Sequence, residues 1–125
     1  MRQILFAHPD IKLVQIYESY LKKHFSFDSA HDGLTALRKI RILKPHLIVS
    51  EYHLPLISGL SLLKFIRNHQ EMSRTPFIFL TKHEDPVHAL ELGANEWILR
   101  HTASPDLVLE KIYNHIRQNH GVQIY

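Results

Sequence analysis

The chain has 125 residues, enough for one domain with a hydrophobic core and too few for two ordinary domains, and its 45% hydrophobic and 22% charged residues are typical of a globular protein. It has no cysteine, which excludes disulfides, thiolate metal sites and cysteine nucleophiles, and no apolar stretch of about 18 residues, so we expect a cytoplasmic protein with no membrane association. Its net charge of +3 comes from basic residues scattered along the chain, which argues against a dedicated nucleic-acid-binding segment.

In chain order, short apolar segments alternate with amphipathic ones. The apolar segments are predicted strands, at residues 4–7, 25–30, 47–50, 77–80 and 97–99. The strongly apolar ones show no clean alternation of apolar and polar residues, which indicates strands covered on both faces, as in a parallel sheet. The third strand stops abruptly at the carboxylate of Glu51.

Each strand is followed by a segment whose composition predicts a helix. In chain order the five helices begin near residues 11, 32, 58, 86 and 105. The first three repeat apolar side chains every three or four positions, and Pro45 ends the second. Asp85 with Pro86, and Ser104 with Pro105, each supply an N-cap and a proline in the first turn, so we expect the last two helices to begin there.

This alternation predicts an α/β fold with a doubly wound parallel sheet and helices on both faces. In such sheets the binding site lies outside the carboxyl ends of the strands, where the strand order reverses. The residues that leave the strands at this edge are His8, Pro9, Glu51, Thr81 and Arg100.

Three segments resemble the receiver domain of bacterial two-component response regulators. They are KPHLIVSEYHLPLISGLSLLKFIR, TPFIFLT and ALELGANEWILR, and the similarity extends over positions 3–118. The resemblance implies a CheY-like, flavodoxin-like fold with a five-stranded parallel sheet in the order 2-1-3-4-5 and five flanking helices. It also implies a signalling module, and we expect a receiver-like domain at residues 1–120 with a C-terminal tail at 121–125.

The resemblance assigns the functional positions of the family to six residues of this chain: the acidic pair to His8 and Pro9, the phosphoacceptor aspartate to Glu51, the phosphoryl-binding hydroxyl and lysine to Thr81 and Arg100, and the switch aromatic to Trp97. Only the hydroxyl position keeps the residue type of the family. The chain therefore resembles a pseudo-receiver, whose phosphorylation site is degenerate.

These departures change the expected chemistry. Magnesium is usually anchored by one or two carboxylates, whereas Pro9 offers no side-chain ligand and His8 offers a softer nitrogen. Glu51 remains, with Asp10 as an auxiliary carboxylate, and the extra methylene of Glu51 displaces the carboxylate from the position of an aspartate. We expect very weak magnesium binding, no cofactor and no phosphorylation cycle. The alternative is a weakly phosphorylated receiver that regulates an attached or separate DNA-binding output module.

Two further questions stay open at this point. Glu51 either engages Thr81 and Arg100 in imitation of a phosphoryl group or forms a structural ion pair with Arg100. His8, Glu51 and His53, with His101, are an alternative transition-metal site, and a protonated His8 paired with Glu51 below about pH 6.5 is an alternative pH sensor.

Other classes of function find less support. The four glycines form no phosphate-binding loop and there is no GxSxG elbow, so we do not expect an enzyme. We expect protein partners of a regulatory pathway, with a face at residues 86–92, 95–100 and 105–118 that either forms a homodimer or is an ordinary charged surface. The basic helix at residues 38–44 is the candidate nucleic-acid surface, and we interpret it as a solvated helix face.

Overall fold

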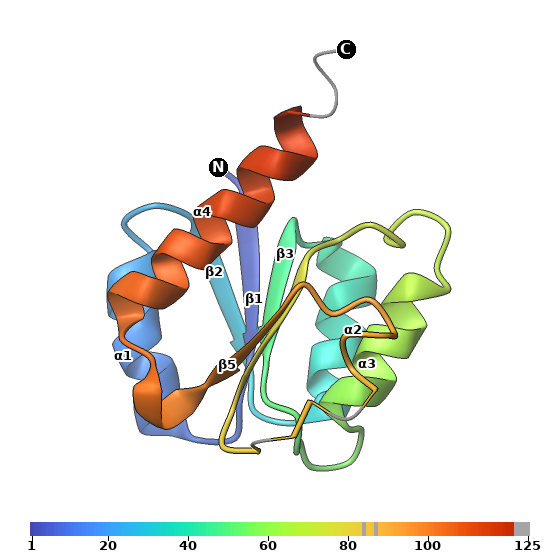
Figure 1. Ribbon diagram of the computed structural model, residues 1–125, viewed down its shortest axis with the longest axis horizontal. Coiled ribbons are helices and arrows are strands. Elements are labelled where there is room, and N and C mark those ends of the chain that lie inside the picture. The colour runs from blue at the N-terminus through green and yellow to red at the C-terminus, as the bar shows by residue number, and fades with distance from the viewer. Residues whose placement is uncertain (84, 87, 122–125) are drawn as a thin grey trace.

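The computed structural model describes residues 1–83, 85–86 and 88–121, and the side chains of those residues up to 117. Its centre is a five-stranded parallel sheet in the order β2-β1-β3-β4-β5, as predicted (Figure 1). The strands are β1 (Gln3–Ala7), β2 (Ser26–Ala30), β3 (Leu47–Ser50), β4 (Phe77–Thr81) and β5 (Glu96–Leu99). The helices of the described residues are α1 (Ile11–Leu21), α2 (Gly33–Leu43), α3 (Gly59–Arg67) and α4 (Pro105–Gly121), with a short 3-10 helix η1 (Arg100–Thr102).

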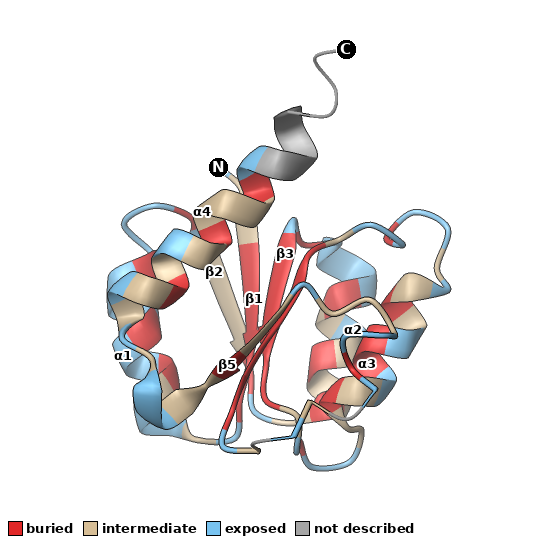
Figure 2. Ribbon diagram, in the orientation of Figure 1, coloured by how far each residue is buried: buried red, intermediate tan, exposed pale blue. Residues whose placement is uncertain are grey.

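The helices cover both faces of the sheet, with α1 and α4 on one side and α2 and α3 on the other (Figure 1). Ile4 and Phe6 of β1 belong to the core beneath α1 and α4, whereas Leu5 and Ala7 belong to the core beneath α2 and α3. Successive side chains of a strand point to opposite faces, so a strand buried on both needs an unbroken apolar run. Figure 2 shows the resulting burial along the central strands and on the helix sides that face them.

Short polar side chains fix where the helices begin. Asp10 caps α1 by accepting a hydrogen bond from the amide of Leu13 at 3.2 Å. Ser104 does the same for α4 through the amide of Leu107 at 3.1 Å, as its sequence position predicted. None of the helices formed by described residues is both long and apolar enough to span a membrane.

The helix expected from Pro86 is the one element that the prediction placed wrongly. The described residues of this segment form turns, in which Ala89 N donates to Pro86 O at 2.8 Å and Gly93 N donates to Leu90 O at 3.1 Å. Gly93, with φ of 102°, ends the segment soon after Pro86, and Leu90 is 52% exposed. So short a segment, in which Ala89 is the only buried side chain among the described residues from 86 to 93, does not stabilise an α-helix. The sheet therefore has four described helices and the η1 turn around it instead of five helices.

The C-terminal boundary of the expected domain falls within the last helix. Helix α4 continues to Gly121, the first residue of the predicted tail. Residues 122–125 of that tail lie outside the described residues, as do residues 84 and 87 within the segment that was expected to be helical.

Candidate functional site

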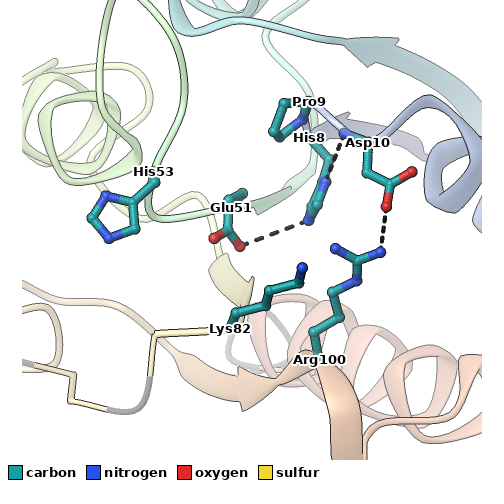
Figure 3. A pocket seen from close by; sticks show the side chains of 7 residues that line it. All are labelled: His8, Pro9, Asp10, Glu51, His53, Lys82 and Arg100. Carbon is teal, nitrogen blue, oxygen red and sulfur yellow. Dashed lines mark hydrogen bonds and ion pairs between the residues drawn. The ribbon is translucent and has the colours of Figure 1, made fainter.

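A cavity of about 350 Å³ lies at the carboxyl edge of the sheet, where the predicted site residues leave their strands. Its lining comes from the β1–α1 loop, the ends of β3 and β4, and the start of η1: His8, Pro9, Asp10, Glu51, His53, Lys82 and Arg100 (Figure 3). Neighbouring parallel strands end at the same edge, which brings residues from positions 8 to 100 of the chain into one site.

Glu51 forms the floor of this cavity and is only 7% exposed. Its amide donates to Ala7 O at 2.9 Å, which continues the pairing of β3 with β1, and Thr81 Oγ1 donates to its Oε1 at 2.8 Å. Burial raises the pKa of the Glu51 carboxyl, and the hydrogen bond from Thr81 opposes this rise. The contact between Glu51 and Thr81 that one of the two alternatives contained is therefore present, without Arg100.

The backbone around Glu51 is closely packed by α3. A Cβ added at Gly59 would lie 2.2 Å from the carbonyl oxygen of Glu51 and 2.9 Å from the ring of Phe79. Glycine at this position thus allows the first turn of α3 to approach the end of β3 and keeps the Glu51 backbone in place.

His8 lies beside Glu51 and is 2% exposed. Its Nδ1 accepts a hydrogen bond from the amide of Asp10 at 3.2 Å, so the neutral ring carries its proton on Nε2. Nε2 lies 3.7 Å from Glu51 Oε2, too far for a hydrogen bond, and neither atom has a hydrogen-bond partner among the described residues.

His8 is uncharged at neutral pH. Burial, and then the nearby charges of Arg100 and Lys82, lower its pKa to about 4, although Asp10 acts in the opposite direction. The contact with Glu51 is therefore no ion pair near neutrality. The expectation that His8 gains its charge near pH 6.5 is wrong, because a buried imidazole among cations resists protonation.

Arg100 binds a different carboxylate from the one expected. Its Nη2 donates to Asp10 Oδ2, and no contact with Glu51 is found among the described residues. The side chains of Arg100 and Asp10 keep 23% and 35% of their surfaces exposed, so they pair without the desolvation that reaching buried Glu51 would require. The hydrogen bond from Leu13, followed by that from Arg100, lowers the pKa of Asp10. Neither predicted form of a Glu51–Arg100 pair is therefore present.

The histidines do not gather around Glu51. His53 is exposed and its ring lies to the side of Glu51 away from His8, while His101 is exposed on η1 and does not line the cavity (Figure 3). Within the described part of the chain, no three His, Asp or Glu side chains are placed to hold one metal ion. The alternative of a histidine-rich metal site is not supported by this arrangement.

Trp97 packs in an aromatic cluster next to the cavity. Its ring lies 5.0 Å from that of Phe79 and 5.5 Å from that of Tyr52, and its Nε1 donates to His83 O at 3.0 Å. Tyr52 in turn stacks on the His83 ring at 5.0 Å with 7° between the planes. These contacts hold the indole between β4 and the loop that follows it.

Lys82 is the site residue that the sequence analysis missed. It follows Thr81 directly, is exposed, and reaches into the cavity toward Glu51 and Arg100 (Figure 3). Its ammonium group has no hydrogen-bond or ion-pair partner among the residues that the structure describes. Its place immediately after the fourth strand was the available signal, since the residues that follow β1, β3 and β5 at this edge also line the cavity.

The sequence model of the response regulator receiver domain matches residues 4–112. The chain belongs to this family. The receiver assignment is thus confirmed, and with it the role of a signalling module in response-regulator pathways, whose receivers work with protein partners such as kinases and output domains.

Two curated relatives and one solved structure illustrate this similarity. Chemotaxis protein CheY-3 of Vibrio cholerae is 30% identical over 92 residues, which cover 70% of this receiver and 71% of CheY-3. Transcriptional regulatory protein GltR of Pseudomonas aeruginosa is 30% identical over 127 residues, which cover 98% of this chain but only 52% of GltR. The signal receiver domain of a putative Luxo repressor protein from Vibrio parahaemolyticus shares the fold, with a TM-score of 0.88, 22% identity and coverage of 99% and 97% of the two chains.

Proposed function

We propose that this receiver regulates through protein contacts and does not undergo phosphorylation at Glu51. The proposal rests on the small number of free side-chain oxygens that line the cavity. Phosphoryl transfer depends on a metal ion that neutralises the developing charge, and magnesium needs oxygen ligands in near-octahedral geometry.

The cavity offers very few such oxygens. Pro9 has no ligand atom, and both oxygens of Asp10 are engaged, one by the Leu13 amide and one by Arg100. Thr81 occupies Glu51 Oε1, which leaves Oε2 as the one carboxylate oxygen of the described lining without a partner. The cationic side chains of Lys82 and Arg100 also line the cavity and oppose a divalent cation. These residues do not fit magnesium.

The Glu51–Thr81 bond and the packing of Trp97 support a receiver that keeps one conformation. Thr81 is the hydroxyl that the family resemblance assigns to phosphoryl binding, and here it already donates to the acceptor position at 2.8 Å. Trp97, at the switch position, is fixed by its hydrogen bond to His83 O. Partner proteins would then recognise a surface that is always presented.

The proposed partner surface is the face formed by residues 86–92, 95–100 and 105–118. Its polar side chains pair with one another, as Glu96 does with His115 at 2.7 Å and with Lys111 at 3.9 Å, and as His88 does with Glu91 at 3.5 Å. Its charged residues also include Asp106 and Arg117. Leu90 is an exposed apolar side chain among these charges, which supports contact with a second copy or another protein. Residue 87 and the side chain of residue 118 lie outside the described residues.

The second candidate is a receiver that is still phosphorylated weakly and controls an output module. Its support is GltR, a transcriptional regulatory protein of which this chain spans about half the length. Asp10 lines the cavity and is the carboxylate that would assist a metal ion if its bond to Arg100 opened.

Acetyl phosphate with magnesium separates the two candidates. We expect no gain of a phosphoryl group by intact-mass spectrometry, and no change in Trp97 fluorescence with magnesium followed by beryllofluoride. The combined variant His8→Asp, Pro9→Asp and Glu51→Asp restores the carboxylates and serves as the positive control. A phosphoryl gain in the unmodified receiver that Glu51→Gln abolishes would replace the first candidate with the second.

A further inference from the structure

The end of α2 carries a basic segment that belongs neither to the cavity at the sheet edge nor to the proposed partner surface. The helix has no acidic residue and carries Arg38, Lys39 and Arg41 in its second half, with Lys44 as its C-cap. Ile42, next to Arg41, is 78% exposed. Figure 2 shows this end of α2 as exposed surface, on the face of the sheet opposite α1 and α4.

The structure divides these four cations into two kinds. Lys39 Nζ pairs with Asp28 Oδ1 at 2.9 Å, and Lys44 Nζ pairs with Glu71 Oε2 at 2.7 Å, so the chain itself neutralises both lysines. The two arginines form no hydrogen bond or ion pair among the described residues. Their charges are therefore available to an anionic group from outside the chain.

The two arginines and the exposed isoleucine share one concave surface. Arg38, Arg41 and Ile42 line a cavity of about 360 Å³. Because positions 41 and 42 follow position 38 by three and four residues, the three side chains lie on the same side of α2. A planar guanidinium binds a carboxylate through two parallel N–H donors. Two such groups beside an exposed isoleucine are complementary to an apolar side chain flanked by carboxylates.

The small size of this surface favours a protein segment over other polyanions. Nucleic-acid binding commonly neutralises about 6 to 10 phosphates, and anionic membranes are recognised by clusters of about 4 to 8 basic residues. Here the described chain leaves two cations of α2 without an ion-pair partner. Protein interfaces, in contrast, gain affinity from a few arginines around an apolar contact.

We propose that this α2 patch, formed by Arg38, Arg41 and Ile42, docks an acidic segment of a partner protein. The guanidinium groups bind its carboxylates, and an apolar side chain between them packs on Ile42. The inference is independent of the proposed function, because the patch shares no residue with the cavity at the sheet edge or with the face at residues 86–118. Since α2 and α4 lie on opposite faces of the sheet, the receiver can hold one partner on each face (Figure 1).

Selection from a library of random peptides displayed on phage tests which chemistry the patch binds. The full chain is the target, and the double variant Arg38→Gln with Arg41→Gln is used to remove peptides that bind elsewhere. We expect the enriched peptides to carry glutamates or aspartates on both sides of an aliphatic or aromatic residue. Enrichment of neutral or basic peptides, or no enrichment, would overturn the inference.

Fluorescence anisotropy of the most enriched peptide then measures the contribution of each side chain. The double variant should weaken binding at least about tenfold, since it removes both charge-assisted interactions. Ile42→Ser should weaken binding about fivefold at low and at high salt, because salt does not screen an apolar contact. Glutamine and serine have helix propensities close to those of arginine and isoleucine, so α2 should stay folded. Circular dichroism checks this.

Helix α1 and the turn that follows it provide matched controls on the opposite face of the sheet. Lys12→Gln with Lys23→Gln removes two exposed cations, and Ile16→Ser removes an isoleucine that is 50% exposed. Both control proteins should bind the peptide as the unmodified chain does. Equal losses for the α1 and α2 variants would show nonspecific attraction and refute the site.

Two further probes test the other occupants. Duplex DNA and phosphatidylglycerol vesicles should bind more weakly than the peptide. Tighter binding of either, lost in the double arginine variant, would replace the acidic segment as the occupant and refute the inference. A phosphoryl gain from acetyl phosphate would refute the proposed function but leave the α2 patch in place, whereas loss of peptide selectivity would do the reverse.

Discussion

The floor and the rim of the cavity each pair a carboxylate with a basic group, yet the two pairs differ in charge state. At the floor, His8 and Glu51 are buried, His8 is neutral and the two side chains lie 3.7 Å apart. At the rim, Asp10 and Arg100 are partly exposed and form a charged hydrogen bond. Solvent stabilises the charges of the partly exposed pair at the rim, whereas the buried pair at the floor is desolvated. Burial therefore decides which pair is ionised.

The strongest test of this comparison is the pH dependence of stability. Folding lowers the pKa of His8 from 6.5 to about 4, so the unfolded chain binds more protons between these values and stability falls as the pH drops through this window. The loss approaches about 3 kcal/mol near pH 4. The raised pKa of Glu51 opposes it, because protonation of the folded carboxyl stabilises the fold at low pH.

Denaturant unfolding from pH 7 to 4 isolates the histidine contribution when the chain is compared with His8→Gln. The variant should lose less stability than the unmodified chain over this range. Parallel pH profiles for the two proteins would show that His8 is not kept neutral by burial.

Gly59→Ala should displace the backbone at Glu51 by a steric clash. The added Cβ would lie 2.2 Å from the Glu51 carbonyl oxygen, which a backbone cannot tolerate without moving. We expect a loss of about 2 to 3 kcal/mol in the free energy of unfolding. Lys64→Ala, on an exposed position of the same helix, should change it by less than about 0.5 kcal/mol. A well-folded Gly59→Ala protein of normal stability would refute the close packing of α3 on β3.

Thr81→Val removes the hydrogen bond to Glu51 Oε1 while keeping the side-chain shape. The buried carboxylate then loses its side-chain donor, so stability should fall by about 1 to 2 kcal/mol and the pKa of Glu51 should rise further. Thr102→Val, at an exposed hydroxyl, is the control for unfolding measurements. Carbon NMR of the Glu51 carboxyl would detect the change in its titration, and an unaltered titration would contradict this assignment.

The smallest effect is expected at the rim. Asp10→Asn keeps an N-cap for α1 but removes the charge that pairs with Arg100, so it should lower the free energy of unfolding only slightly, and less at high salt. Asp32→Asn changes the cap of α2, which forms no ion pair with an arginine within the described part of the chain, and provides the matched comparison. Equal losses for both variants at every salt concentration would show that the Arg100 pair contributes nothing.

Much of the fold could be predicted because its causes are local. The unbroken apolar runs of β1, β3 and β4 indicated burial on both faces, and Ser104 with Pro105 indicated the start of α4. The same reasoning gave the wrong result at Asp85 and Pro86. A start signal cannot by itself sustain a helix, and among the described residues from 86 to 93 only Ala89 is buried.

The sequence predicted which residues lie at the site, but not all of the hydrogen bonds and ion pairs that they form. Glu51 and Thr81 end neighbouring strands, so their contact followed from strand order. The choice of Arg100 between Asp10 and Glu51 depends on desolvation of individual atoms, which the sequence does not encode locally. Lys82 was not predicted because the family resemblance assigns the cationic position of the site to Arg100.

Asp10 carries a consequence for mechanics. Its carboxylate caps α1 and also binds Arg100 of η1, which directly precedes α4. The ends of α1 and α4 that lie nearest the cavity are therefore linked, although Asp10 and Arg100 are 90 positions apart in the chain. A protein that binds α4 and displaces η1 would therefore also displace the first turn of α1 through this ion pair, without any rearrangement of the sheet.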